Sequence, residues 1–365
     1  MIHPSSVAAR SVAALALLCT LAPAAHASTL YVANNGVNPR VCSSGLGCGV
    51  GAGTPPCRSI TCALGSAQAG DTIIVGPGRY GDLDNDGTLG EVGEEKPSAS
   101  CGCMVAVNKP VILVSSHGAA STVIDGRSMD VAKNVLLMFN GGEFGRPGKG
   151  FTVTNTKRHL ADGIVIDGTN IKVRGNQVLA TLVYPYTVQQ PFPRGGISAL
   201  SGGPILIEGN QVIGQWEYGI LAQGTGKTVR KNQVSVSTTY GIYAQGDNVV
   251  VGNVVTATGV GIVLQDGAKA VGNAVSGNIY GIAAFGSEGS LFSGAIERNN
   301  IASSLYCGVD NTGVPSLNAT NNYWGAATGP GPDPADQVCN EDEGTTTVTT
   351  PFATVPFLVK APIKP

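Results

Sequence analysis

Charged side chains are scarce in this sequence. Lysine, arginine, aspartate and glutamate make up 13% of its 365 residues, and the net charge is −2. The usual charged share of a soluble domain is about 25%. Such a chain lacks the basic footprint of a nucleic-acid-binding protein, which excludes that class of partner. It also has no overall attraction for acidic polysaccharide, so any such binding must come from a local patch of charge.

Long apolar runs are missing beyond the N-terminus. The first 27 residues combine Arg10, an apolar run from Val12 to Ala24 and a small-x-small sequence that ends at Ala27. This pattern predicts a secretory signal peptide, residues 1–27. A membrane anchor is the alternative, but the run is shorter than the roughly 20 residues that a span needs. We therefore expect a secreted protein, periplasmic or extracellular, that crosses no membrane and is a monomer.

Cysteine pairs with the metal-binding Cys-x-x-Cys spacing are absent. Apart from Cys19, which precedes the cleavage site, eight cysteines remain, and no histidine lies among the first six. An even number of cysteines in an exported chain predicts disulfides rather than zinc ligands. Cys307 and Cys339 stand alone in the C-terminal region and are predicted to pair. The sequence does not choose among the pairings of the other six, which are Cys42, Cys48, Cys57, Cys62, Cys101 and Cys103.

Glycine, in contrast, is abundant and periodic. The chain has 52 glycines, about twice the average share. Seven of them precede a β-branched apolar residue at intervals of 20 to 33 residues: Gly163-Ile164, Gly196-Ile197, Gly219-Ile220, Gly241-Ile242, Gly261-Ile262, Gly281-Ile282 and Gly308-Val309. A second phrase runs in phase with the first, around Asn176, Asn210, Asn232, Asn253, Asn273, Asn299 and Asn322. Two motifs that repeat together near 22 residues predict one unit stacked on itself, which is a solenoid.

Each repeat is too short for a pair of helices. Its apolar runs, such as 205–207 and 249–251, are β-branched and only three to six residues long. They predict two or three short strands joined by glycine or asparagine turns. Stacking would pair each strand with its copy about 4.8 Å away and place the residues after the glycines in one apolar stack. We expect the asparagines at the bends, in left-handed backbone, with side-chain amides bonded from coil to coil.

These motifs resemble those of right-handed parallel β-helix proteins in the pectate/pectin lyase-like superfamily, over about residues 28–357. We therefore expect an all-β fold, a single-stranded right-handed parallel β-helix. The resemblance implies an N-terminal cap at 28–70 with a short helix at about 60–68, coils at 71–317 and a C-terminal cap at 318–365. In the C-terminal cap, the sequence from Asn321 to Gly325 resembles the superfamily's exit signature. We expect a loop at 333–350 and a segment at 351–358 over the last coil, because a bare coil end exposes the core.

Two insertions, 81–102 and 180–194, break the regular spacing, and the first contains a candidate calcium site. Asp82, Asp84 and Asp86 are followed by glycine, the spacing that places alternate carboxylates around Ca²⁺. The twelfth position of an EF-hand loop is Gly93 here, but Glu91 and two further glutamates lie near it. Three carboxylates within five residues repel each other without a cation. We predict a structural Ca²⁺ site that orders this loop; a solvated acidic loop is the alternative.

Residues able to do chemistry gather around the second insertion. They are Lys157, Arg158, His159, Asp162, Arg194 and Glu217, which stack at one edge, and Tyr184, Tyr186 and Phe192 in the insertion itself. As a site, Arg158 or Arg194 would bind a uronate carboxylate, His159 or Lys157 would act as base, and Tyr184 or Tyr186 as acid. Two alternatives stay open: an exposed ion-pair ladder, and an aromatic loop that folds onto apolar coil surface.

The resemblance implies a polysaccharide partner, since superfamily enzymes cleave or epimerise acidic polysaccharides on one long sheet face. It therefore implies a lyase or a hydrolase. However, the rows two and four residues beyond each repeat glycine, predicted to face outward, contain no carboxylate cluster with an adjacent base. Their glutamines suggest an exposed side-chain ladder, and Tyr218, Tyr240 and Tyr280 a packing stack or a sugar platform. A non-catalytic structural or glycan-binding module is the alternative to an enzyme.

Overall fold

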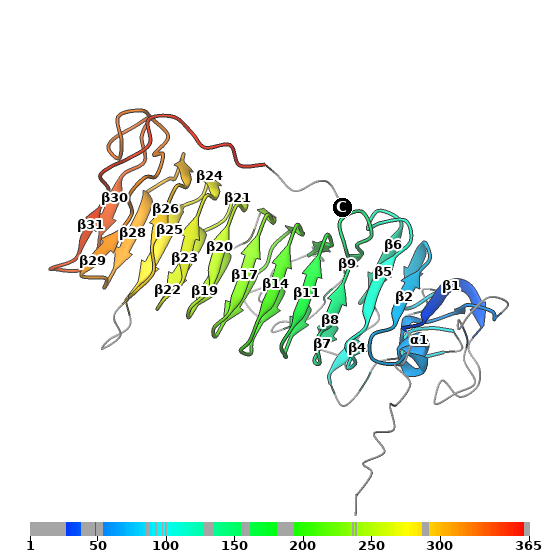
Figure 1. Ribbon diagram of the computed structural model, residues 1–365. Coiled ribbons are helices and arrows are strands. Elements are labelled where there is room, and N and C mark those ends of the chain that lie inside the picture. The colour runs from blue at the N-terminus through cyan, green and yellow to red at the C-terminus, as the bar shows by residue number, and fades with distance from the viewer. Residues whose placement is uncertain are drawn as a thin grey trace, which may run out of the picture.

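The chain winds into successive coils, and each complete coil adds one strand to each of three parallel sheets (Figure 1). The computed structural model describes residues 27–37, 48, 54–84, 86, 88, 90–91, 93–96, 98, 101–127, 134–154, 156, 161–180, 193–235, 237, 239–286 and 292–360. The coils form an elongated solenoid that is closed at each end by its own cap (Figure 1). The all-β parallel β-helix predicted from the sequence is confirmed.

We name the three sheets A, B and C. Sheet A contains β1 (Thr29–Val37), β2 (Thr72–Val75), β5 (Ile112–Ser115), β8 (Gly142–Phe144), β11 (Ile171–Arg174), β14 (Ile205–Glu208), β17 (Lys227–Arg230), β20 (Val249–Val251), β23 (Lys269–Val271) and β26 (Ile296–Glu297). Sheet B contains β3 (Gly78–Tyr80), β6 (Thr122–Asp125), β9 (Thr152–Thr154), β12 (Gln177–Leu179), β15 (Gln211–Ile213), β18 (Gln233–Ser235), β21 (Val254–Thr256), β24 (Ala274–Ser276) and β27 (Asn300–Ala302). Sheet C contains β4 (Cys103–Val107), β7 (Asn134–Met138), β10 (Asp162–Ile166), β13 (Gly195–Ala199), β16 (Tyr218–Gln223), β19 (Tyr240–Gln245), β22 (Val260–Gln265), β25 (Tyr280–Phe285), β28 (Cys307–Thr312) and β30 (Val338–Asn340).

The residues after the repeat glycines form the predicted apolar stack in sheet C. They pair in register from one coil to the next and are fully buried: Ile164, Ile197, Ile220, Ile242, Ile262, Ile282 and Val309. The repeat glycines are required by close packing. A Cβ on Gly241 would lie 2.5 Å from the carbonyl oxygen of Gly261 and 2.5 Å from Cγ1 of Val255. Any larger residue would force neighbouring coils apart.

The seven asparagines of the second phrase form a buried ladder at the turns from sheet A to sheet B. Asn232, for example, donates from Nδ2 to Oδ1 of Asn253 at 3.0 Å and to the carbonyl of Ile207 at 3.0 Å. The backbone N–H of Asn232 also donates to Oδ1 of Asn253, at 2.9 Å. The left-handed residue is not the asparagine, as predicted, but the residue before it: Gly175, Gly209, Lys231, Gly252, Gly272, Arg298 and Asn321. The asparagine needs its own backbone N–H directed along the ladder, so the preceding residue makes the sharp bend.

The row two residues beyond each repeat glycine lies on the outer face of sheet C, as predicted, but most of its members are buried. Val165, Ser198, Leu221, Val263 and Ala283 are 5% exposed or less. On this outer face of sheet C, side chains in adjacent coils pack against one another, since the strands lie only about 4.8 Å apart. Val165 belongs to a second, smaller apolar cluster of this kind, with Leu137 and Cys103.

The other two sheets carry polar ladders on their outer faces. On sheet A, Glu143, Arg174, Glu208 and Arg230 alternate in sign over four coils, with ion-pair distances of 2.7 to 2.9 Å. On sheet B, the amide of Gln177 donates to Gln211 at 3.4 Å, and that of Gln211 donates to Gln233 at 3.1 Å. The glutamine row predicted on sheet C, Gln223, Gln245 and Gln265, also pairs in register from coil to coil.

Both ends of the solenoid are covered. Helix α1 (Ile60–Ser66) packs its buried face, Ile60 with Leu64, on the first coils, and Ser59 caps its N-terminus. At the other end, β30 pairs with β28, and β29 (Ser316–Asn318) pairs with β31 (Thr346–Val348). Residues 333–350, expected to be a loop, thus contain two short strands, because the edges of the last coil need partners. The segment after Pro351 runs back along sheet B, where Asn300 and the backbone of Phe357 exchange two hydrogen bonds of 2.8 Å (Figure 1).

Candidate functional site

An open groove follows the turns that lead from sheet B to sheet C, which we call the B–C corner. Its volume is about 900 Å³. It spans five consecutive turns, and most of its lining residues are small, polar or both: Gln215, Ser237, Ala257, Thr258, Gly259, Gly277, Asn278, Ile279, Ser303, Ser304, Leu305, Asp333 and Pro334. Five turns are four coil steps, or roughly 19 Å at about 4.8 Å a step. The groove therefore suits an extended ligand.

Polar atoms in the groove wall have unused hydrogen-bonding capacity. Oε1 of Gln215 and Oγ of Ser237 are buried and have no hydrogen-bond partner. Leaving such a group unsatisfied costs about 1–3 kcal/mol, so an ordered water is the expected partner. Next to these groups, Ile279 and Leu305 are 42% and 69% exposed. The wall thus combines hydroxyl and amide groups with apolar surface.

Tyrosine side chains follow the groove where the sheet C strands begin. The rings of Tyr218 and Tyr240 are stacked, with centroids 5.3 Å apart, and both meet the ring of Tyr243 edge-on at 5.6 Å. Further along, Tyr280 lies 5.6 Å from Tyr306, which is 57% exposed. The three tyrosines that precede repeat glycines are half-buried. Tyr218 and Tyr240 pack on each other, as the sequence predicts, whereas Tyr280 packs on Tyr306.

Charged residues lie at the N-terminal end of the same corner. Asp162 begins β10, Arg194 precedes β13 and Glu217 precedes β16. Backbone hydrogen bonds join these turns: the N–H of Arg194 donates to the carbonyl of Ala161 at 2.9 Å, and the N–H of Tyr218 donates to the carbonyl of Arg194 at 2.8 Å. Burial raises the pKa of Asp162 to about 6, although a hydrogen bond from Ser198 and the charge of Arg194 oppose the shift. The Ser198 hydroxyl donates to Asp162 at 2.5 Å. Asp162 is only 2% exposed, so it lies beneath this surface.

Several residues of the predicted site lie outside the described part of the chain. These are Lys157, Arg158, His159, Tyr184, Tyr186 and Phe192; residues 1–26 of the predicted signal peptide also lie outside it. The structure brings together the remaining members, Asp162, Arg194 and Glu217, on adjacent coils, as the spacing predicts.

The groove itself was not predicted from the sequence. A signal for it exists, since a small polar residue or glutamine recurs three or four positions before successive repeat glycines: Gln215, Ser237, Thr258, Asn278 and Ser304. Such residues are also common in ordinary turns, so the recurrence gains meaning only once the coils are stacked.

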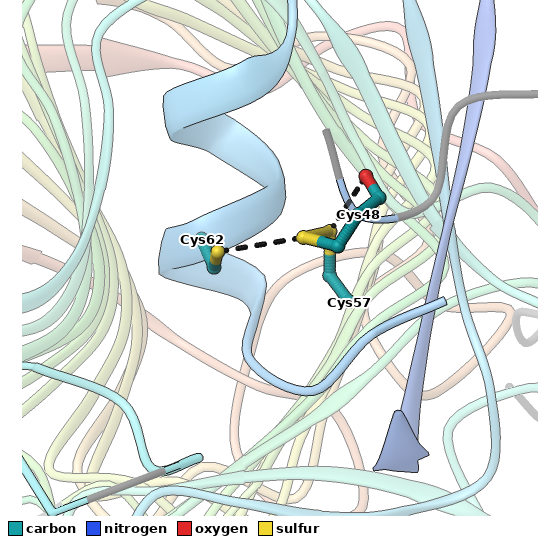
Figure 2. Close-up of side chains that lie close together, drawn as sticks. All are labelled: Cys48, Cys57 and Cys62. Atoms are coloured by element: carbon teal, nitrogen blue, oxygen red, sulfur yellow. Dashed lines mark hydrogen bonds between the residues drawn. A yellow bond between two sulfur atoms is a disulfide. The ribbon is translucent and has the colours of Figure 1, made fainter. Parts of the chain in front are cut away.

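Two groups of side chains away from the corner contain metal-ligand atoms. In the loop after β3, the carboxylates of Asp82, Asp84 and Asp86 offer oxygens within 4.8 Å of one another, and Glu91 joins Asp84 in a second, overlapping group. In the N-terminal cap, the sulfur atoms of Cys48, Cys57 and Cys62 lie within 4.8 Å of one another (Figure 2).

Disulfides occupy these cap cysteines. Cys48 is bonded to Cys57, and the sulfur of Cys62 lies 3.4 Å from that of Cys48 (Figure 2). Cys62 is itself disulfide-bonded. Elsewhere, the structure pairs Cys101 with Cys103 and Cys307 with Cys339.

The fold and the groove define a parallel β-helix protein with an elongated surface site along one corner. The family described as "Periplasmic copper-binding protein (NosD)" matches residues 121–329, which is more than half of the chain. The chain belongs to this family, which its description places in the periplasm. No curated protein matches the chain. Among the described residues, no helix has both the length and the apolar character of a membrane span.

Two solved lyase structures support the fold. Pectate lyase Pel9A is similar with a TM-score of 0.53 and 12% identity, over 89% of this chain and 79% of that one. A rhamnogalacturonan lyase is similar with a TM-score of 0.50 and 11% identity, over 89% and 87% of the two chains. The A-module of mannuronan C-5 epimerase AlgE6 from Azotobacter vinelandii reaches 0.44 and 13% identity, over 79% and 92%. At these identities the likeness concerns the fold alone.

Proposed function

We propose that this protein binds an extracytoplasmic polysaccharide along the B–C corner. The observation that carries the proposal is the groove of about 900 Å³, which continues over five turns beside a row of tyrosines. Aromatic rings offer flat apolar faces with a polar tip, and a binding site typically combines such surface with a few polar groups that fix orientation. The lyases with a similar fold act, by their names, on pectate and rhamnogalacturonan, which supports a polysaccharide ligand.

The charges along the corner divide the proposed site into two parts. Arg194, at the N-terminal end, offers a guanidinium that pairs well with a uronate carboxylate. At the other end, Asp333 is the charged residue among those lining the groove, and it repels acidic sugars. We therefore expect an acidic sugar to bind near Arg194 and neutral sugars to bind along the groove.

Cleavage of the bound glycan, by a lyase or a hydrolase, is the second candidate function. A group with a pKa near 6 suits proton transfer at neutral pH, and Asp162 has this property beside Arg194 and Glu217. Its burial, however, separates it from a ligand on the surface. The described geometry therefore favours a glycan-binding module without catalysis.

Copper binding, which the family's description suggests, does not fit the described residues. Copper prefers thiolate, thioether and imidazole ligands. The clustered cap cysteines are disulfide-bonded and therefore offer no thiolate, and His117 is the histidine among the described residues. We derive no role for copper from this geometry.

The test is a binding and activity screen of the mature protein with pectin, alginate, glycosaminoglycans and neutral glycans. We expect binding without cleavage and a loss of affinity of at least about tenfold in Tyr240→Ala, since a stacked ring contributes about 1–3 kcal/mol by analogy with base stacking. Tyr31, on β1 and 48% exposed, supplies the matched control Tyr31→Ala. Arg194→Ala should weaken binding of an acidic glycan more than of a neutral one.

Two outcomes would change the conclusion. Equal affinities for the Tyr240→Ala and Tyr31→Ala variants would move the site away from the B–C corner. New absorbance from an unsaturated uronate would identify a lyase, and new reducing ends without that absorbance would identify a hydrolase.

A further inference from the structure

The loop that follows β3 crowds carboxylates around Asp84. Oxygens of Asp82, Asp84 and Asp86 form one group within 4.8 Å, and oxygens of Asp84, Glu91 and Glu94 form another. The backbone N–H groups of Asp86 and Thr88 turn toward the carboxylates of Asp84 and Asp86, at 3.2 and 2.7 Å. These groups fold the loop so that its acidic side chains converge.

Glu94 distinguishes this cluster from an ordinary acidic surface. Its side chain is buried, with 6% exposed, and Oε1 accepts the backbone N–H of Leu83 at 2.7 Å. The other oxygen, Oε2, is buried and has no hydrogen-bond partner. Glu94 also lines a cavity of about 410 Å³ together with Arg58, Leu83, Asp84 and Glu91. A buried carboxylate oxygen without a partner is costly unless a cation or donor reaches it.

We infer that this cavity binds one Ca²⁺ ion through Asp84, Glu91 and Glu94, with Asp82 or Asp86 completing the set of carboxylates. Ca²⁺ takes six to eight oxygen ligands in flexible geometry, whereas Mg²⁺ demands near-ideal octahedral geometry and gives up its water reluctantly. A loop that offers several carboxylates at unequal depths therefore favours Ca²⁺. This site is independent of the glycan groove and lies at the other end of the solenoid.

The bound ion would fasten the loop to the N-terminal cap. The residue after Glu94 is Glu95, which is 1% exposed. Its carboxylate accepts the backbone N–H groups of Ile60 and Thr61, at 2.5 and 2.9 Å, and also the Thr61 hydroxyl. An ion that holds the Glu94 side chain in place would thus also hold the adjacent Glu95, whose carboxylate binds the first turn of helix α1.

The experiment uses the full mature protein, first stripped with a chelator. Isothermal titration with CaCl₂ should show one site, with a Kd in the range of about 10⁻⁴ to 10⁻³ M that is usual for extracellular modules. Saturating Ca²⁺ should raise Tm and slow amide exchange in α1 more than in the central coils. MgCl₂ at the same concentration should do neither. Asp84→Asn should abolish both responses, while Asp167→Asn, an exposed carboxylate elsewhere, should leave them intact.

The Glu94→Gln variant separates an ion site from a purely structural role. Without Ca²⁺ it should melt at or above the temperature of the unsubstituted protein, because it removes a buried charge that lacks a partner. With Ca²⁺ it should gain no stability, and its affinity should fall by about tenfold or more. A Glu94→Gln variant that responds to Ca²⁺ like the original protein would overturn the inference. So would unchanged melting on addition of Ca²⁺, which would mean that Arg58 already neutralises the cavity.

Discussion

Each ladder asparagine holds three successive coils together at one point. Asn253 donates to Asn273 in the next coil and to the carbonyl of Val229 in the coil before, and its own Oδ1 accepts from Asn232. A glutamine would be too long for this spacing, and an aspartate would have no N–H to donate. Asparagine is thus required here, because the buried side chain must both donate and accept hydrogen bonds and is 0% exposed to solvent.

A single buried carboxylate should control part of the pH dependence of stability. The pKa of Asp162 is raised from 3.8 to about 6 in the folded protein. Between about pH 4 and pH 6 the folded state keeps a proton that the unfolded state has lost, so this group's effect on stability becomes more unfavourable as pH rises. Asparagine cannot ionise but can still accept the Ser198 hydrogen bond.

We therefore expect Asp162→Asn to gain stability relative to the original protein as pH increases from 4 to 7. Thermal unfolding of both proteins across this range measures the difference in Tm. A difference that stays constant with pH would show that Asp162 is ionised in the folded state at all of these values.

An individual strand contributes to stability through contacts between its side chains and those of the adjacent strands in neighbouring coils. Strands β8, β11, β14 and β17 each contribute one charged residue to the alternating ladder on sheet A, and Glu208 lies between Arg174 and Arg230. Burial alone would raise the pKa of Glu208, but hydrogen bonds from Arg230 and Arg174 lower it below its ordinary value. A lowered pKa means that the ladder stabilises the fold above about pH 4.5 and loses this effect as the pH falls.

The prediction at this scale is that Glu208→Gln destabilises the protein at pH 7 by roughly 1 kcal/mol, since partly exposed ion pairs are weak individually and stronger in networks. The loss should disappear near pH 3 and shrink at high salt. Denaturant unfolding at the two pH values measures it. Gln211→Ala, on sheet B, is the control and should show no such pH dependence.

At the scale of the whole molecule, stability comes from continuous stacks rather than from one central core. A charge placed in such a stack interrupts it for the coils on both sides. Ile242→Asp should therefore unfold the middle of the solenoid, because the carboxylate has no partner in the sheet C stack. Gln245→Ala, three residues along the same strand and half-buried, should change the unfolding free energy by well under about 1 kcal/mol. Similar melting temperatures for the two variants would contradict the assignment of inner and outer faces.

Features that repeat with the coil could be predicted from the sequence. Glycine, isoleucine and asparagine recur at fixed places in each coil, so the fold, the core stack and the amide ladder follow from their phase alone. Features that depend on how different coils align with one another could not be predicted from the sequence. Glu143, Arg174 and Glu208 become neighbours only through turns of unequal length, and the wall of the groove is made from residues typical of any turn. The spacing could therefore place Asp162, Arg194 and Glu217 on adjacent coils, whereas the groove that follows them along the corner could not be predicted.

The last strand of sheet C, β30, keeps the solenoid from pairing with a second chain. Sheet C ends at β30, which pairs with β28 and is joined to it by the Cys307–Cys339 disulfide. A chain truncated after Thr312 would present the bare edge of β28, and an unpaired edge is a template for another chain. Because helix α1 still covers the N-terminal end of the solenoid, the bare β28 edges of two truncated chains would pair with each other. We expect the truncated protein to associate through this edge, visible as a species of higher mass in size-exclusion chromatography with light scattering, so the C-terminal cap keeps the open end of sheet C from pairing with a second chain.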